Sequence, residues 1–165
     1  SKKTIHLPNG KEIKEPSKTK SGYSESETFV VLYTLMDQYP DLFKFNFMDY
    51  NTTKGIDFVV DENGSPKYIE LKGTFTKKIN HPYRYIYKFI CYDIDVYNND
   101  IVEDMEDIKA SLIEQKCDCF ESNDEQFNSR KYTSYVLQPS TATIQSMEVI
   151  CLKSFLQQVI GATIQ

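Results

Sequence analysis

Asp57, Glu70 and Lys72 are three ionisable residues whose types and spacing suit metal-dependent phosphodiester hydrolysis. Two carboxylates a few ångströms apart repel each other and resist joint ionisation unless a cation neutralises them. Magnesium suits such a pair because it is a hard ion, usually held by one or two carboxylates, water and substrate phosphate. The backbone carbonyl of Leu71 could add a ligand. Lys72 could orient the attacking water and stabilise the charge that develops on the phosphate.

A β-hairpin is the element that would position these residues. Residues 56–60 (IDFVV) and 67–71 (KYIEL) are short apolar runs rich in β-branched and aromatic residues. Between them lies Asn63-Gly64, a dipeptide that tolerates positive φ at a tight reversal. The pattern predicts two antiparallel strands joined at this turn.

Strand alternation then decides which side chains meet. Glu70 and Lys72 share one face of the second strand, while Ile69 and Leu71 share the other. If Asp57 pairs with Glu70 across the hairpin, three charged groups converge on one side of an otherwise apolar ribbon. Burying them unpaired would be costly, so we expect them to hold a cation or one another.

Asp57 followed after a hairpin by Glu70-Leu71-Lys72 resembles the signature of the PD-(D/E)xK phosphodiesterase superfamily, which includes restriction endonucleases and repair nucleases. Ile56 stands where the superfamily name has proline, a position that is frequently replaced. The resemblance implies an α/β fold of the restriction-endonuclease type, with a mixed central β-sheet flanked by helices. It also implies a Mg²⁺-dependent endonuclease, with Mn²⁺ able to substitute, that cuts nucleic acid, most directly DNA.

A helix is predicted before the hairpin, from the capping-box pair Ser24 and Glu27 to Tyr39, just before Pro40. Helical spacing predicts that its inner face consists of Phe29, Leu32, Tyr33 and Met36.

Members of the superfamily often carry a further acid on this helix that supports the metal site. Glu25 and Glu27 are both candidates, and Glu27 is chosen because its spacing before the valines resembles that of several members. Glu27 also has a purely structural reading, since it would close the capping box and favour the positive end of the helix.

Further strands are predicted at 87–94, 132–139 and 147–152, with a last helix ended by Gly161. The intervening acidic insertion, 93–130, is expected to begin with an amphipathic helix and to end in a polar loop from 121 to 130. Helical spacing within it is kept by Ile101, Met105, Ile108 and Leu112. Residues 1–20 are expected to be a basic N-terminal segment and 21–165 a single nuclease-like domain.

Charge argues against a simple nucleic-acid enzyme, because the formal net charge is -5. The exit of the hairpin is locally basic, however. Five residues there are predicted to contact phosphates or to assist catalysis: Lys77, Lys78, His81, Arg84 and Lys88. Tyr83, Tyr85 and Tyr87 alternate beside them and could stack on bases or pack against neighbouring strands. Dependence on a partner or a second subunit is expected, since an acidic domain alone should bind DNA poorly.

A narrower resemblance rests on 27–33 (ETFVVLY), 68–75 (YIELKGTF) and 89–95 (FICYDID). These resemble the nuclease-like domains that follow some bacterial ATPases of the gyrase, Hsp90 and histidine-kinase group. The resemblance implies an ATPase domain or partner, and restriction-type nucleases often act as homodimers. With no apolar run of the roughly 18 residues that suggest a membrane span and no signal-peptide core at the N-terminus, a cytoplasmic location is expected.

Two alternatives stay open from the sequence. The charged triad could be an internal salt-bridge cluster in an inactive nuclease-like fold that binds nucleic acid or serves assembly. A glycosidase using Asp57 and Glu70 as its carboxylate pair would leave Lys72 unexplained.

Overall fold

The computed structural model describes residues 2–51 and 57–165, and the side chains of Tyr50, Asn51 and Asp57 fall outside that description. Within this part of the chain the protein is mixed α/β, with one large sheet and few helices. The elements are β1 (Thr4–His6), β2 (Glu12–Lys14), β3 (Lys18–Thr19), β4 (Gly22–Tyr23), α1 (Glu25–Gln38), β5 (Asn46–Asn51), β6 (Asp57–Glu62), β7 (Ser65–Phe75), the 3₁₀ turn η1 (Tyr83–Tyr85), β8 (Lys88–Ile94), β9 (Ile101–Glu103), β10 (Lys109–Cys119), β11 (Lys131–Pro139), β12 (Met147–Cys151), α2 (Leu152–Phe155), the π-helical turn η2 (Leu156–Ile160) and β13 (Thr163–Ile164).

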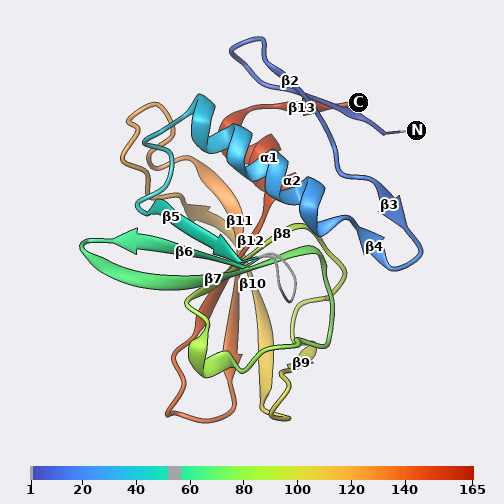
Figure 1. Ribbon diagram of the computed structural model, residues 1–165, viewed down its shortest axis with the longest axis vertical. Helices are drawn as coiled ribbons and strands as arrows, with labels where there is room; N and C mark the ends of the chain where they lie inside the picture. The colour runs from blue at the N-terminus through green and yellow to red at the C-terminus, as the bar shows by residue number, and fades with distance from the viewer. Residues whose placement is uncertain (1, 52–56) are drawn as a thin grey trace.

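The large sheet has the order β5-β6-β7-β8-β12-β11-β10-β9 among the described residues. Its middle strands are parallel, because β8 runs parallel to both β7 and β12, and the other neighbouring pairs are antiparallel. Figure 1 shows α1 and α2 on the same side of this sheet. A mixed sheet with helices is therefore confirmed, at the level of the α/β class.

Two apolar cores lie on the two faces of the sheet. On the helix side, Val31, Leu32 and Leu35 of α1 pack on Ile69 and Leu71 of β7. The opposite face is covered largely by loops and turns: Ile79, Tyr83, Ile86 and Val96 pack on Phe75, Phe89 and Cys91. Burial of apolar area on both faces stabilises the sheet.

The N-terminal residues belong to the same folded body as the rest of the chain. β1 pairs with β2 and also with β13, so both ends of the chain meet in a small second sheet (Figure 1). Ile5, Leu7 and Ile13 are buried in the helix-side core. The lysine-rich stretch at 2–20 thus contributes apolar side chains to the helix-side core.

α1 begins and ends where its sequence predicts. The Ser24 hydroxyl accepts a hydrogen bond from the Glu27 amide, and the helix ends at Tyr39. The predicted inner face is only partly right, since Leu32 is buried but Tyr33 is 57% exposed. The buried positions are Thr28, Val31, Leu32 and Leu35. This set keeps the same helical spacing on a rotated face, and periodicity alone cannot choose between the two.

The helix expected at the start of the acidic insertion is wrong. Residues 101–119 contain β9 and β10 instead, and β10 pairs with both β9 and β11. Leu112 is buried opposite Leu137 of β11, whereas Ile101 and Met105 are 46% and 62% exposed. Ala110 and Leu112 alternate into the core, and the cross-strand partners override the apparent helical spacing. The polar loop at 121–130 is confirmed as irregular.

The downstream predictions hold well. β8, β11 and β12 lie at the three predicted strands. The last helical segment ends at Gly161, which has a φ of 81° and adopts the left-handed conformation that ends many helices. No helix among the described residues has the length and apolar character needed to cross a membrane.

Candidate active site

The predicted hairpin forms, and its register places Asp57 directly opposite Glu70. β6 and β7 are joined at Asn63 and Gly64, whose φ angles of 54° and 80° give the tight reversal expected of this dipeptide. Glu70 lies in the middle of the large sheet and is only 2% exposed. A carboxylate this deeply buried needs cations or donors around it.

Lys72 follows Glu70 on β7 and reaches two carboxylates. Its Nζ lies 3.9 Å from Oε1 of Glu70 and 4.0 Å from Oε1 of Glu25, at the start of α1. Only 15% of the Lys72 side chain is exposed. Strand alternation and the start of the helix thus bring an ammonium and two acids to one place.

His81 also meets Glu70. Its Nδ1 lies 2.5 Å from the Glu70 Oε1, and the imidazole is about a quarter exposed. The sequence suggested phosphate contact or a catalytic role for this residue and no contact with Glu70. The histidine lies in a loop eleven residues further along the chain, so no local periodicity could have shown the contact.

The structure places Glu25, and not Glu27, beside Lys72. The Glu27 carboxylate pairs instead with Lys2 and accepts a hydrogen bond from Ser17 at 3.1 Å. These hydrogen bonds, the one from Lys2 above all, lower the pKa of Glu27. The second hydrogen bond of a capping box would run from the Ser24 amide to the Glu27 carboxylate. It is absent from the described contacts, because the Ser24 amide donates to the Ser17 carbonyl instead. The supporting-acid role stays a prediction, and the geometry favours Glu25 for it.

Gly73 explains how the start of α1 comes so close to β7. A Cβ at this position would lie 1.7 Å from the carbonyl oxygen of Tyr23, so a larger residue could not be accommodated without displacement. The Tyr23 amide also donates to the Thr74 hydroxyl at 2.9 Å. The glycine after Lys72 therefore lets the chain just before Glu25 cross directly over the strand.

The residues predicted to hold a metal are oxygen donors. Two carboxylates at paired strand positions, Asp57 and Glu70, are the kind of oxygen ligands that hard cations prefer. The Leu71 side chain is a hydrocarbon, so only the backbone carbonyl of this residue could contribute. No three acidic, histidine or cysteine side chains of the described residues converge as a metal-binding group. The Asp57 side chain lies outside those residues.

Two of the predicted phosphate contacts are paired with acids of the insertion. Arg84 makes a bidentate pair with Glu106, in which Nε and Nη2 lie 3.0 and 2.8 Å from the two carboxylate oxygens. Lys77 Nζ lies 3.7 Å from Asp100. Lys78 is exposed, and its backbone bridges to Glu103. The fold therefore brings the acidic stretch back onto the basic one, which reduces the local positive charge expected from the sequence.

The three tyrosines do not form an alternating strand, because η1 is a turn. Tyr83 is buried and its hydroxyl donates to the Val102 carbonyl at 2.5 Å. Tyr85 is exposed, with the Arg84 guanidinium 4.5 Å from its ring centre. Of the three, Tyr85 has the exposure that stacking on a base would need.

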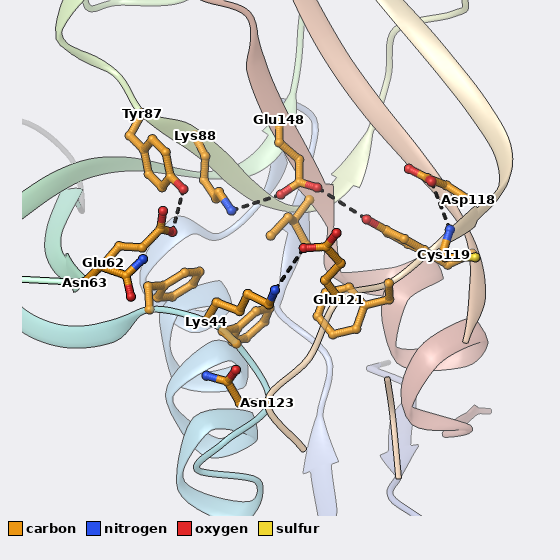
Figure 2. A pocket seen from close by; sticks show the side chains of 15 residues that line it. Lys44, Glu62, Asn63, Tyr87, Lys88, Asp118, Cys119, Glu121, Asn123 and Glu148 are labelled. Carbon is orange, nitrogen blue, oxygen red and sulfur yellow. Dashed lines mark hydrogen bonds and ion pairs between the residues drawn. The ribbon is translucent and has the colours of Figure 1, made fainter. Parts of the chain in front are cut away.

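A separate polar cavity of about 570 Å³ opens beside the hairpin turn. Figure 2 shows Lys88 reaching Glu148 and Lys44 reaching Glu121, and both distances are 3.0 Å. The Tyr87 hydroxyl donates to Glu62 at 2.5 Å, and burial raises the pKa of this tyrosine, which remains a donor.

The charge of this cavity is unsuited to a polyanion. Its two lysines are paired, and Glu62 and Asp118 add two further negative charges to its lining. Lys88, predicted as a phosphate contact, is thus occupied within an acidic pocket. The cavity is distinct from the Glu70 cluster, none of whose residues lines it.

Comparisons with known proteins found no matching family model, no matching curated protein and no matching solved structure.

Proposed function

We propose that this chain is a metal-dependent phosphodiesterase that hydrolyses nucleic acid, most directly DNA, on a restriction-endonuclease-like fold. One observation carries the proposal: the hairpin register pairs Asp57 with Glu70 while Lys72, two residues on, lies 3.9 Å from the same glutamate. An antiparallel hairpin next to a parallel strand, with a helix packed on the sheet, suits that superfamily.

Each residue has a distinct role in the proposed reaction. Asp57 and Glu70 hold Mg²⁺ or Mn²⁺, with the Leu71 carbonyl as a further ligand. The bound ion supplies Lewis-acid stabilisation of the phosphate and a more acidic water. Lys72 orients the attacking water and stabilises the negative charge of the transition state, because its ammonium is mostly buried and held between two acids. Glu25 fixes the position of that ammonium.

DNA binding is proposed to depend on a further domain or subunit. The net charge is -5, and Arg84, Lys77 and Lys88 are paired with carboxylates. Affinity for nucleic acid comes mainly from cations that neutralise phosphates. An attached or associated ATPase, or a second copy of the chain, would supply the missing positive charge.

The charged cluster itself favours one alternative. Lys72 lies near both Glu25 and Glu70, and His81 contacts Glu70, so the acids of the cluster have partners within it. Such a cluster can be retained for structural specificity without catalysis. The chain would then be a nuclease-like module for binding or assembly.

Cleavage assays separate these two functions. Wild type should nick supercoiled plasmid with Mg²⁺ or Mn²⁺ and lose this activity with a chelator, whereas Asp57→Asn and Glu70→Gln should be inactive while remaining folded. Wild type that leaves DNA and RNA intact with both metals, on its own and with a cognate partner, would favour the structural alternative.

A further inference from the structure

The cavity beside the hairpin turn combines an aromatic wall with charged side chains (Figure 2). Its volume of about 570 Å³ lies in the range of small-molecule sites. The Phe43 ring stacks on Phe45 with their centres 4.9 Å apart, so the wall is packed against itself. The aromatic wall is formed by Phe43, Phe45, Tyr87, Phe120 and Tyr132, all of which except Tyr87 are buried.

Lys88 shows which charge this wall stabilises. Its Nζ lies 5.4 Å from the ring centre of Phe45 and 5.0 Å from that of Tyr87. The same nitrogen is 3.0 Å from Oε1 of Glu148, and only 15% of the Lys88 side chain is exposed. The faces of aromatic rings carry negative potential and attract ammonium groups. The cavity therefore already holds one alkylammonium group, supplied by the chain itself.

Two further carboxylates of the cavity are not neutralised. The two lysines of the lining pair with two of its four carboxylates. The other two, Glu62 and Asp118, accept hydrogen bonds from the hydroxyls of Tyr87 and Ser134, and neither has a lysine or arginine partner among the described residues. Figure 2 shows Glu62 and Asp118 on opposite sides of the pocket, with Lys88 between them. The cavity thus offers two separated negative charges.

We propose that this cavity binds an aliphatic polyamine, a flexible chain with two or more ammonium groups. One ammonium pairs with Glu62 and a second pairs with Asp118, while the methylene groups between them lie against the aromatic wall. Alkyl chains pack on apolar surface in this way while their charged ends keep polar partners. An anionic ligand would be repelled by the same two carboxylates. The site goes beyond the proposed hydrolysis, because none of the Glu70 cluster lines the cavity.

Spermidine is the probe, and titration calorimetry of the full chain at fixed ionic strength measures its binding. Glu62→Gln and Asp118→Asn should each weaken binding by about 10-fold, because each removes one hydrogen bond between charged groups. Glu12→Gln and Asp37→Asn are the matched controls, since both acids are exposed and lie outside the lining. These controls should keep the affinity within about 2-fold.

Two further measurements test the contact at both ends and along the wall. Butylamine, with a single ammonium group, should bind at least about 10-fold more weakly than spermidine, because it reaches only one of the two carboxylates. Nuclear Overhauser contacts between the spermidine methylenes and the ring protons of Tyr87 should appear in the wild-type chain. This readout does not depend on any variant remaining folded.

Diffuse attraction of a cation to an acidic chain would give different results. Equal losses in the control variants, equal affinity for butylamine, or complete displacement of spermidine by Mg²⁺ at the same ionic strength would each overturn the inference. Absence of spermidine binding, or of its contacts with the Tyr87 ring, would also overturn it. Each of these outcomes leaves the phosphodiesterase proposal standing.

Discussion

Lys72 lies between two carboxylates, one on its own strand and one at the start of α1. Ion pairs of this kind gain little on an exposed surface, but Glu70 is 2% exposed and Lys72 is mostly buried. The position of the ammonium then depends on Glu25 as well as on Glu70. At the residue scale, the Lys72 ammonium lies 4.0 Å from Glu25 and 3.9 Å from Glu70, the carboxylate proposed to bind the metal.

Glu25 and Glu27 provide a matched pair for testing this arrangement. Glu25→Gln should slow cleavage by about 10-fold or more, the usual cost of removing a positioning group at a metal site. Glu27→Gln removes the same charge two residues further along α1 and should leave the rate within about 2-fold, because Glu27 contacts Lys2 and Ser17. Single-turnover rates at saturating metal measure both. The reverse order of effects would restore Glu27 as the supporting acid.

The sequence alone predicts that Glu70 and Lys72 share a face, because side chains two residues apart on one strand point to the same side. It could also pair Asp57 with Glu70, since the Asn63-Gly64 turn sets the register. It could not place His81, because the contact depends on a loop held by β9. The sequence favoured Glu27 over Glu25 for a similar reason: it could not show that Lys2, which pairs with Glu27, comes from the distant N-terminal segment before β1.

Two elements, β7 and the segment leading into α1, set the geometry of the site by crossing at Gly73. No side chain fits at this crossing, because an added Cβ would overlap the Tyr23 carbonyl. The close approach holds the first turn of the helix, with Glu25, beside Lys72. The need for a glycine at position 73 is therefore linked to the position of Lys72, the proposed catalytic lysine.

Gly73→Ala should lower the free energy of unfolding by about 1 to 3 kcal/mol, as overpacked sites do, and should also slow cleavage by moving α1 away from Lys72. Gly64→Ala is the control on the same hairpin. Its added methyl group meets nothing, and its positive φ should cost about 1 to 2 kcal/mol without affecting the cleavage rate. Urea unfolding and single-turnover cleavage measure the two effects. Full activity in Gly73→Ala would show that the crossing does not position the site.

The predicted helices, turns and strands are correct where the signal lies within a few residues of the element. They are wrong where an element depends on a partner strand that is distant in the sequence. The Ser24 cap, the turn after Glu62 and the Gly161 stop are all encoded within a few residues. β10 was missed because its identity comes from β11, whose Leu137 lies opposite Leu112. Helical spacing of a few apolar residues cannot reveal such a partner.

Across the whole molecule, the basic stretch after the hairpin is covered by the acidic insertion. The sequence separates these charges, but the residues on either side of β9 bring Asp100 to Lys77 and Glu106 to Arg84. The resulting surface is closer to neutral than the distribution along the chain suggests. This arrangement explains physically why an isolated chain should bind DNA weakly.

Removing two of these acids should raise DNA affinity. Asp100→Asn with Glu106→Gln frees Lys77 and Arg84, and each new phosphate contact should steepen the dependence of log affinity on log salt by about 0.9. Asp37→Asn with Glu125→Gln, two exposed changes away from the basic stretch, removes the same net charge and is the control. Fluorescence anisotropy over a salt series measures the slopes. Equal slopes for the double variant and the control would mean that the basic stretch does not face DNA.

The most direct test of the central claim is the single-turnover cleavage rate of Lys72→Ala at saturating metal. Removal of a group that acts on the water and the transition state should reduce the rate by on the order of 100-fold or more, while metal binding, which depends on Asp57 and Glu70, persists. Lys116→Ala, an exposed change on β10, should cleave as wild type does. Cleavage by Lys72→Ala at the wild-type rate would contradict the proposed active site.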